Sequence, residues 1–200
     1  MQRKHPSNTA ILILAAGRSS RMGRPKQLLN YRGKSLLQHT IDIALESEAK
    51  TVIVVLGYEA GKIENYIQKK TAVVLKNAEW ESGMATSISM GISFLQEQAV
   101  LADNVLIMVC DQPHVSKELI NRLIQTQEEN KHSILACSYA NTIGTPAIFS
   151  KEYFDELSKL RGDRGAKSIL NKYAEIVGNI SFSKGSIDID TSENYKNLIE

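Results

Sequence analysis

The stretch Leu14-Ala-Ala-Gly-Arg-Ser-Ser-Arg-Met-Gly-Arg-Pro-Lys26 decides how the rest of the chain is interpreted. It follows residues 9–14, a short apolar run with the length and composition of a buried strand. It precedes residues 35–45, where apolar side chains recur at the spacing of an α-helix. Glycines such as Gly17 and Gly23 let the backbone approach a ligand closely and turn its N–H groups toward an anion. The stretch therefore predicts a nucleotide-binding loop between a strand and a helix.

The basic side chains of this loop suit the oxygen atoms of phosphate groups. Arg18, Arg21, Arg24 and Lys26 are all donors without acceptors. The alternative is a solvated basic surface loop, and short motifs of this kind do occur by chance. The loop follows the first strand of an alternating chain, and ligands of open α/β sheets bind at the carboxyl ends of strands. It is not a P-loop, because no Gly-Lys-Ser/Thr closes it, and its glycine spacing is not that of a dinucleotide fingerprint.

Strand-like and helix-like segments alternate after the loop. Apolar runs predict buried strands, and amphipathic stretches between them predict helices. From about residue 130 the rhythm changes, with shorter elements that include an antiparallel strand or two. The predicted strands are residues 51–56, 72–75, 104–110, 133–139, 144–149, 175–182 and 186–189, and the predicted helices are residues 59–70, 84–98, 117–129, 151–160, 166–172 and a last one after Thr191. We expect one α/β domain over residues 1–200, a mostly parallel central sheet with helices on both faces.

Composition limits the kinds of partner. The chain has 200 residues, 42% hydrophobic and 23% charged, with a formal net charge of +2. A charge this close to zero argues against a nucleic-acid binder with a broad basic face, so the basic loop points to a small anionic ligand. Cys110 and Cys137 stand inside apolar runs and are expected to be free buried thiols, although a disulfide stays open if their strands are neighbours. No stretch approaches a membrane span, and we expect a cytoplasmic chain.

Aspartates stand at two other places where the chain leaves a strand-like run. Asp111 ends the run at residues 104–110, and Asp188 and Asp190 come near the carboxyl terminus. Mg²⁺ is usually bound by one or two carboxylates together with substrate phosphates. Asp111 could equally be a turn former, and the later pair could simply mark a strand end and a helix start. The sequence nevertheless predicts that these carboxylates meet the basic loop at one edge of the sheet.

Other chemistries find little support. The histidines His5, His39, His114 and His132 are scattered without the spacing of metal ligands, and no Gly-x-Ser-x-Gly elbow is present. Trp80, the single tryptophan, could lie over a planar ligand or anchor the fold.

Taken together, the motifs resemble the MobA-like nucleotidyltransferases, and within them the molybdenum cofactor cytidylyltransferase branch. The resemblance covers nearly the whole chain. It rests on the loop at residues 14–26, Gly57-Tyr58, residues 77–83 with Trp80, Ser87, Gly91, Asp111-Gln-Pro113, Gly144-x-Pro146-x-x-Phe149, Gly162-Asp-x-Gly-Ala166 and Asp188-Ile-Asp-Thr191.

This resemblance implies a Rossmann-like nucleotidyltransferase fold and transfer of CMP from CTP to the phosphate of molybdopterin cofactor, with release of pyrophosphate. The residues it assigns to the nucleotide are Leu14, Ala15, Ala16, Gly17 and Arg18, with Arg21 and Lys26 on the phosphates. Asp111 and Asp190 would bind Mg²⁺. Asp190 is preferred to Asp188 because it stands where a strand is expected to give way to a helix. Arg21, Lys26 and Asp111 would be the catalytic set.

Several features of the sequence bear on the substrates. Ala15-Ala16-Gly17 resembles the cytidylyl branch, whereas the guanylyl branch has Ala-Gly-Gly. Thr145, Ser192 and Asn194 depart from the family pattern and leave the acceptor open. The alternatives are a GTP-using molybdopterin guanylyltransferase, a nucleotidyltransferase for another phosphorylated acceptor, and a carrier of the cofactor without catalysis. A molybdoenzyme or its chaperone is a further expected partner, while nucleic acid and membranes are not.

Overall fold

The central strand of the molecule is the apolar run that precedes the basic loop. The computed structural model describes residues 8–68, 71–98 and 101–199. Its strands are β1 (Thr9–Ala15), β2 (Asn30–Tyr31), β3 (Lys34–Ser35), β4 (Thr51–Leu56), β5 (Val73–Lys76), β6 (Asn104–Val109), β7 (Ile134–Tyr139), β8 (Thr142–Ser150) and β9 (Gly178–Ser181). Its α-helices are α1 (Leu36–Leu45), α2 (Ala60–Glu64), α3 (Met84–Glu97), α4 (Lys117–Asn130), α5 (Phe154–Ser158), α6 (Lys167–Lys172) and α7 (Ser192–Ile199).

Seven of these strands form one sheet in the order β5-β4-β1-β6-β8-β7-β9, and β2 and β3 pair separately. β1 pairs in parallel with both β4 and β6, while β8 pairs antiparallel with both β6 and β7. The prediction of a mostly parallel sheet with antiparallel pairing in the second half is therefore confirmed.

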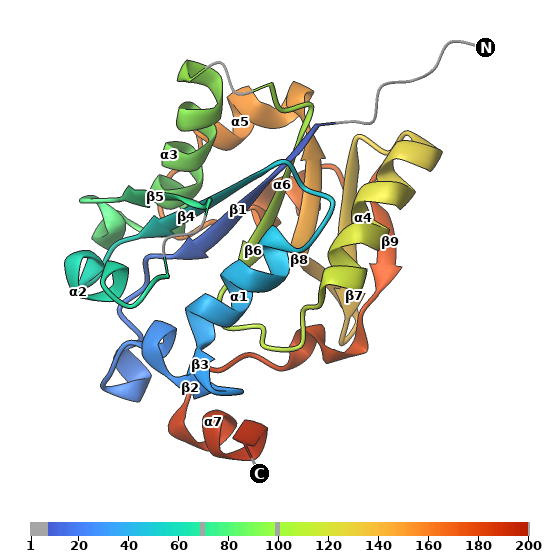
Figure 1. Cartoon of the computed structure of the whole chain (residues 1–200). Helices are drawn as coiled ribbons and strands as arrows, with labels where there is room; N and C mark the ends of the chain where they lie inside the picture. The colour runs from blue at the N-terminus through green and yellow to red at the C-terminus, as the bar shows by residue number, and fades with distance from the viewer. Residues whose placement is uncertain (1–7, 69–70, 99–100, 200) are drawn as a thin grey trace.

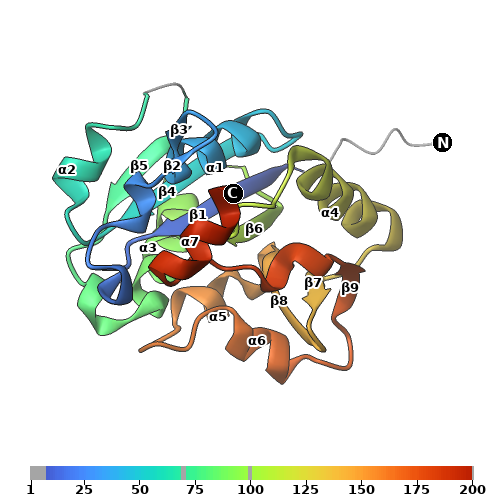
Figure 2. The same cartoon turned by 90° about the horizontal axis from the view of Figure 1, so that it is seen from below.

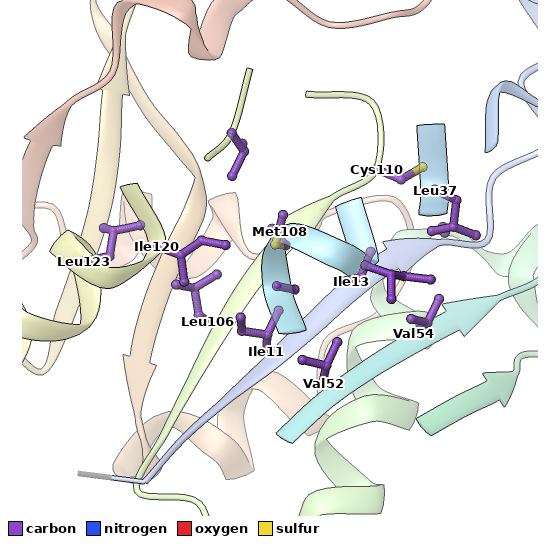
Figure 3. Packing of buried hydrophobic residues seen from close by; sticks show 14 of the residues in the cluster. Ile11, Ile13, Leu37, Val52, Val54, Leu106, Met108, Cys110, Ile120 and Leu123 are labelled. Carbon is purple, nitrogen blue, oxygen red and sulfur yellow. The ribbon is translucent and has the colours of Figure 1, made fainter. Parts of the chain in front are cut away.

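Helices cover both faces of this sheet because successive side chains of each strand point to opposite sides. Ile11 and Ile13 of β1 are fully buried on the face covered by α1 and α4, where Figure 3 shows them with Leu37 and Ile120. Leu12 faces the other side, toward α3, α5 and α6. Figure 1 shows this three-layer arrangement. Burying a large aliphatic side chain contributes about 1.5–3 kcal/mol, so these continuous apolar strands dominate the folding energy.

The strand order places a crevice at the carboxyl ends of β1 and β6. From β1 the chain builds the sheet outward to β4 and β5 on one side, and then returns to the other side with β6. Open α/β sheets bind ligands at such a switch point, outside the carboxyl ends of the strands. The basic loop follows β1 and Asp111 follows β6, so both lie at this crevice.

Two predicted elements differ from the structure. The strand expected at residues 186–189 is absent: a 3₁₀ turn covers Ser183–Ser186, and residues 187–190 have no regular secondary structure. The helix expected at residues 59–70 is α2, which ends at Glu64, and Lys70 itself lies outside the described residues. Ile63 and Ile67 are buried, whereas Tyr66, in the turn after α2, is exposed.

Cys110 and Cys137 are both free and buried, and burial raises the pKa of each thiol to about 12. They therefore remain protonated packing groups. None of the described helices combines the length and the apolar character needed to cross a lipid bilayer.

Candidate active site

A cavity of about 400 Å³ opens at the carboxyl ends of β1 and β6. The predicted residues that line it are Leu14, Ala15, Ala16, Gly17, Arg18, Lys26 and Asp111. Arg21 and Asp190 line a smaller neighbouring pocket, and Lys26 lines both. The structure thus brings the predicted residues to two adjoining pockets that share the Lys26 side chain.

The basic loop is held by a buried amide that the sequence analysis did not single out. Gln27 is 1% exposed, and its Nε2 donates hydrogen bonds to the carbonyl oxygens of Ala15 (2.8 Å) and Gly17 (2.9 Å). These two hydrogen bonds fix the carbonyl groups of Ala15 and Gly17 toward the Gln27 side chain. Lys26 N also donates to Ser19 Oγ at 3.1 Å, closing the loop on itself. In the sequence, only its position next to Lys26 pointed to a role for Gln27, because a glutamine in a polar loop usually lies in solvent.

Lys26 joins the two predicted metal carboxylates. Its Nζ contacts Asp111 Oδ2 and lies 3.1 Å from Asp190 Oδ1. Arg21 Nη1 lies 3.1 Å from Asp190 Oδ2. Side chains that are up to 169 positions apart therefore form one chain of alternating charges. The carboxylate that meets the cations is that of Asp190, whereas the Asp188 side chain lies near Gln112.

The segment that carries Asp190 contacts both Asp111, at the end of β6, and the region between the basic loop and α1. Ile189 N donates to the carbonyl oxygen of Asp111 at 3.0 Å. The Ile189 side chain is buried in a small apolar cluster, which we call the satellite cluster, formed with Met22, Leu29, Tyr31 and Leu36. Tyr195 of α7 donates its hydroxyl to the carbonyl oxygen of Asn30 at 2.7 Å. Figure 2 shows α7 lying across this end of the molecule, close to β2.

α7 begins directly after Thr191, as predicted, and the Thr191 side chain caps it. Its Oγ1 accepts from Asn194 N at 3.1 Å, and Asn194 Oδ1 accepts from Thr191 N at the same distance. This reciprocal pair is the capping arrangement that satisfies free backbone donors at a helix start. Asn194, which departs from the family pattern, therefore has a structural role as part of the cap.

The ion pairs and burial shift the acidities of the site. Burial opposes the charged form of Lys26, but the Asp111 charge and the hydrogen bonds to both carboxylates outweigh it and raise the Lys26 pKa above its ordinary value. For Asp190, burial acts to raise the pKa, but Lys26 and Arg21 hold it below the usual range. Burial of the carboxyl group and the charges of Asp111 and Asp190 raise the pKa of Asp188 to about 6.

The carboxylates present fit a hard divalent cation. Asp111 Oδ1 is buried and has no hydrogen-bond partner, so one strong acceptor is left for a ligand. Within residues 8–68, 71–98 and 101–199, no group of three or more acidic, histidine or cysteine side chains is placed to hold a metal. A pair of carboxylates is instead the usual protein share of a Mg²⁺ site completed by phosphates and water. Asp111 and Asp190 would hold the ion.

Trp80 lines the cavity and also anchors the fold. Its ring contacts Tyr58 edge to face, with centroids 5.5 Å apart. A Cβ added at Gly57 would lie 2.5 Å from the Trp80 Cβ, so the close approach of these two segments requires glycine there. The structure therefore confirms the anchoring role of Trp80, while contact of its ring with a planar ligand stays a prediction. His39, His114 and His132 are not lining residues of the cavity, and His5 lies outside the described residues.

The chain is similar to known proteins over most of its length. The purine catabolism protein PucB of Bacillus subtilis is 30% identical over 196 residues, which cover 92% of each chain. Nicotine blue oxidoreductase of Paenarthrobacter nicotinovorans is 29% identical over 197 residues, 94% of this chain and 95% of that protein.

A solved structure is similar over almost the whole chain. The crystal structure of Rv0371c from Mycobacterium tuberculosis is 29% identical and superposes with a TM-score of 0.80, covering 97% of this chain and all of that one. Rv0371c is also known in complex with manganese, in a structure 27% identical to this chain with a TM-score of 0.78, covering 96% of this chain and 98% of that one.

The sequence profile of one family matches residues 11–176, from the middle of β1 to the turn before β9. The matched segment contains the basic loop, Gln27 and Asp111, while Asp190 follows it. The chain belongs to the family of the MobA-like NTP transferase domain, and is a nucleotidyltransferase.

Proposed function

We propose that this nucleotidyltransferase transfers CMP from CTP to the terminal phosphate of molybdopterin cofactor and releases pyrophosphate, with Mg²⁺ as its metal. The observation that carries the proposal is the contact of Lys26, which lines both adjoining pockets, with Asp111 and Asp190. Two carboxylates for a divalent ion thus lie beside cations for phosphate groups. The sequence Ala15-Ala16-Gly17 on the cavity wall, which resembles the cytidylyl branch, supports CTP over GTP.

In the proposed reaction, a phosphate oxygen of the acceptor attacks the α-phosphorus of CTP. A new P–O bond forms, the bond from the α-phosphorus to the bridging oxygen breaks, and its electron pair leaves with pyrophosphate. A phosphate monoester has a second pKa of about 6, so the nucleophile is largely dianionic near neutral pH and needs no general base. The protein therefore has to position two anions and balance their charge.

The residues divide this work between them. The nucleoside part of CTP would occupy the cavity between β1 and Trp80, against the wall made by Leu14 to Gly17. Lys26 and Arg21 would hold phosphate oxygens, and Lys26 stays charged because its pKa is raised. Asp111 and Asp190 would hold the divalent ion, which would supply electrostatic stabilisation of the charge on the leaving pyrophosphate.

The acceptor would approach from the side of β8. Gln112 directly follows Asp111 in the chain, and its Oε1 accepts a hydrogen bond from Thr145 Oγ1 at 3.3 Å. Gln112 Nε2 donates to the carbonyl oxygen of Gly185 at 2.8 Å. Thr145 departs from the family pattern, so it is the position from which the identity of the acceptor is best tested.

The free thiols of Cys110 and Cys137 support a location in the cytoplasm. A molybdoenzyme or its chaperone would receive the product.

The test is pyrophosphate release from each of the four nucleoside triphosphates, with and without molybdopterin cofactor. We expect release with CTP, dependent on both cofactor and Mg²⁺. Release with GTP instead would make the chain a guanylyltransferase, and release only with another phosphorylated compound would change the acceptor. CTP binding without release under any of these conditions would indicate a carrier.

A further inference from the structure

The ammonium group of Lys26 lies where the proposed metal ligands converge. It contacts Asp111 Oδ2 and is 3.1 Å from Asp190 Oδ1, so it already satisfies one oxygen of each carboxylate. With Arg21 on the second oxygen of Asp190, two positive and two negative side chains balance one another. A divalent ion that binds Asp111 and Asp190 must compete with this ammonium, and so must a nucleotide that takes Lys26 as a phosphate ligand.

We propose that Lys26 acts as a placeholder cation that couples the binding of metal to the binding of nucleotide. A metal ion alone must displace Lys26 from the carboxylates without offering it a new anionic partner. A nucleotide alone must draw Lys26 away and leave two carboxylates uncompensated. When both bind, phosphate oxygens receive Lys26 while the metal receives the carboxylates, and charge remains balanced. The inference rests on the proposed metal and phosphate roles of this site.

Burial assigns this role to Lys26 rather than to Arg21. The Lys26 side chain is 15% exposed and its partner Asp111 18%, so water screens their attraction only partly. The Arg21 side chain is 72% exposed, and exposed ion pairs contribute little. A lysine also has a flexible stem and a compact head with rotatable donors, which suits exchange between a carboxylate and a phosphate.

Coupling of this kind is reciprocal: a nucleotide that raises the affinity for metal must have its own affinity raised by metal by the same factor. Part of that factor comes from direct contact between the metal and the phosphates. The part due to Lys26 is isolated by removing its charge and measuring the metal alone. Such a variant loses a phosphate ligand but gains a carboxylate pair without a competing cation.

The experiment is a titration of Mn²⁺ without nucleotide, followed by the electron paramagnetic resonance signal of the free ion. We expect Lys26→Met to bind Mn²⁺ about tenfold more tightly than the wild type, on the scale of removing one opposing charge from a partly buried site. Arg21→Met should change the affinity less than about threefold. Lys34→Met is the matched control, because Lys34 pairs with Asp42 elsewhere on the surface and its loss changes the net charge equally.

Two further measurements keep the test decisive. Lys26→Gln retains a hydrogen-bond donor without the charge and should also bind Mn²⁺ more tightly, while Lys26→Arg should stay near the wild type. With a non-hydrolysable CTP analogue present, the gain in Mn²⁺ affinity should be smaller in Lys26→Met than in the wild type. Unchanged or weaker Mn²⁺ binding by folded Lys26→Met or Lys26→Gln overturns the coupling.

The outcome is independent of the substrate assignment. If the wild type releases pyrophosphate from CTP but the Lys26 variants gain no affinity for Mn²⁺, the placeholder role is wrong and the proposed reaction stands. If the Lys26 variants gain affinity but no nucleotide yields pyrophosphate, the coupling stands and the proposed reaction is wrong.

Discussion

Two segments supply the charged groups of the site, and they are held in different ways. The loop after β1 is held from within, by Gln27 on the carbonyl oxygens of Ala15 and Gly17. The segment before α7 makes no sheet pairing, and it is held from outside by a hydrogen bond from Ile189 N to Asp111 O and by the satellite cluster. The loop is therefore preformed at the edge of the sheet. The position of Asp190 depends instead on contacts that its segment and α7 make with other parts of the site.

This difference predicts that substitutions in the two segments should affect different binding functions. Damage to the supports of the loop should weaken nucleotide binding, and damage to the supports of the second segment should weaken metal binding. Asp111, at the end of β6, contacts both segments and should be the residue on which both functions depend.

Asp111→Asn should have the largest effect. We expect turnover to fall by about two orders of magnitude or more, on the scale of removing one charge-stabilising group from an active site. The measurement is pyrophosphate release at saturating CTP, cofactor and Mg²⁺. Asp155→Asn, which removes an exposed carboxylate that accepts from Gln96, is the matched control and should leave turnover unchanged. Near-normal metal-dependent turnover of Asp111→Asn would remove this residue from the mechanism.

Gln27→Leu should break the loop. Two carbonyl groups lose their donor, and we expect about 1–3 kcal/mol less unfolding free energy together with a KM for the nucleotide raised about tenfold. Urea unfolding and steady-state kinetics measure the two effects. Gln125→Leu removes an exposed amide that donates to Glu48, and should change neither. A KM that stays normal in a destabilised Gln27→Leu variant would show that Gln27 serves the fold alone.

Ile189→Ala should break the second segment. Ile189 is 1% exposed, and its truncation leaves a gap in the satellite cluster that should cost about 2 kcal/mol of unfolding free energy. We expect Mn²⁺ affinity to fall severalfold while nucleotide binding without metal stays the same. Ile187→Ala, at an exposed isoleucine two residues earlier, serves as the comparison and should be silent. Equal losses of metal and nucleotide binding in Ile189→Ala would contradict the separation of the two supports.

Asp188 and Asp190 should show opposite pH dependence in urea unfolding with the metal chelated. The Asp188 pKa of about 6 exceeds the unfolded value of about 3.9, so the folded state binds more protons and the Asp188 contribution to stability falls as pH rises from about 4 to 6. The Asp190 pKa is lowered, so its contribution is present above about pH 4 and is lost below.

Asp188→Asn should therefore gain stability relative to the wild type between pH 4 and 7, and Asp190→Asn should lose it over the same range. Each difference should stay below about 1 kcal/mol, because both carboxyl groups are only partly buried and water screens their interactions. The same sign for both variants would contradict the assigned charge environments.

The sequence predicted the strands best where continuous apolar runs form the buried centre of the sheet. The apolar runs of β1, β4 and β6 correctly predicted the parallel sheet, and their ends located the loop and Asp111. Residues 187–190 alternate isoleucine and aspartate, which is typical of a half-buried strand, but the structure pairs no neighbouring strand with them. The one buried apolar side chain among them, Ile189, instead packs against Met22, Leu29, Tyr31 and Leu36, which lie far earlier in the chain.

The most direct test of this account is a crystal soaked with Mn²⁺ and CTP, in which anomalous diffraction locates the metal. The account predicts one ion about 2 Å from oxygen atoms of both Asp111 and Asp190, with a phosphate oxygen as a further ligand. It also predicts that Lys26 Nζ has left the two carboxylates for the phosphates. A metal bound away from Asp111, or nucleotide bound while Lys26 still joins the two aspartates, would contradict it.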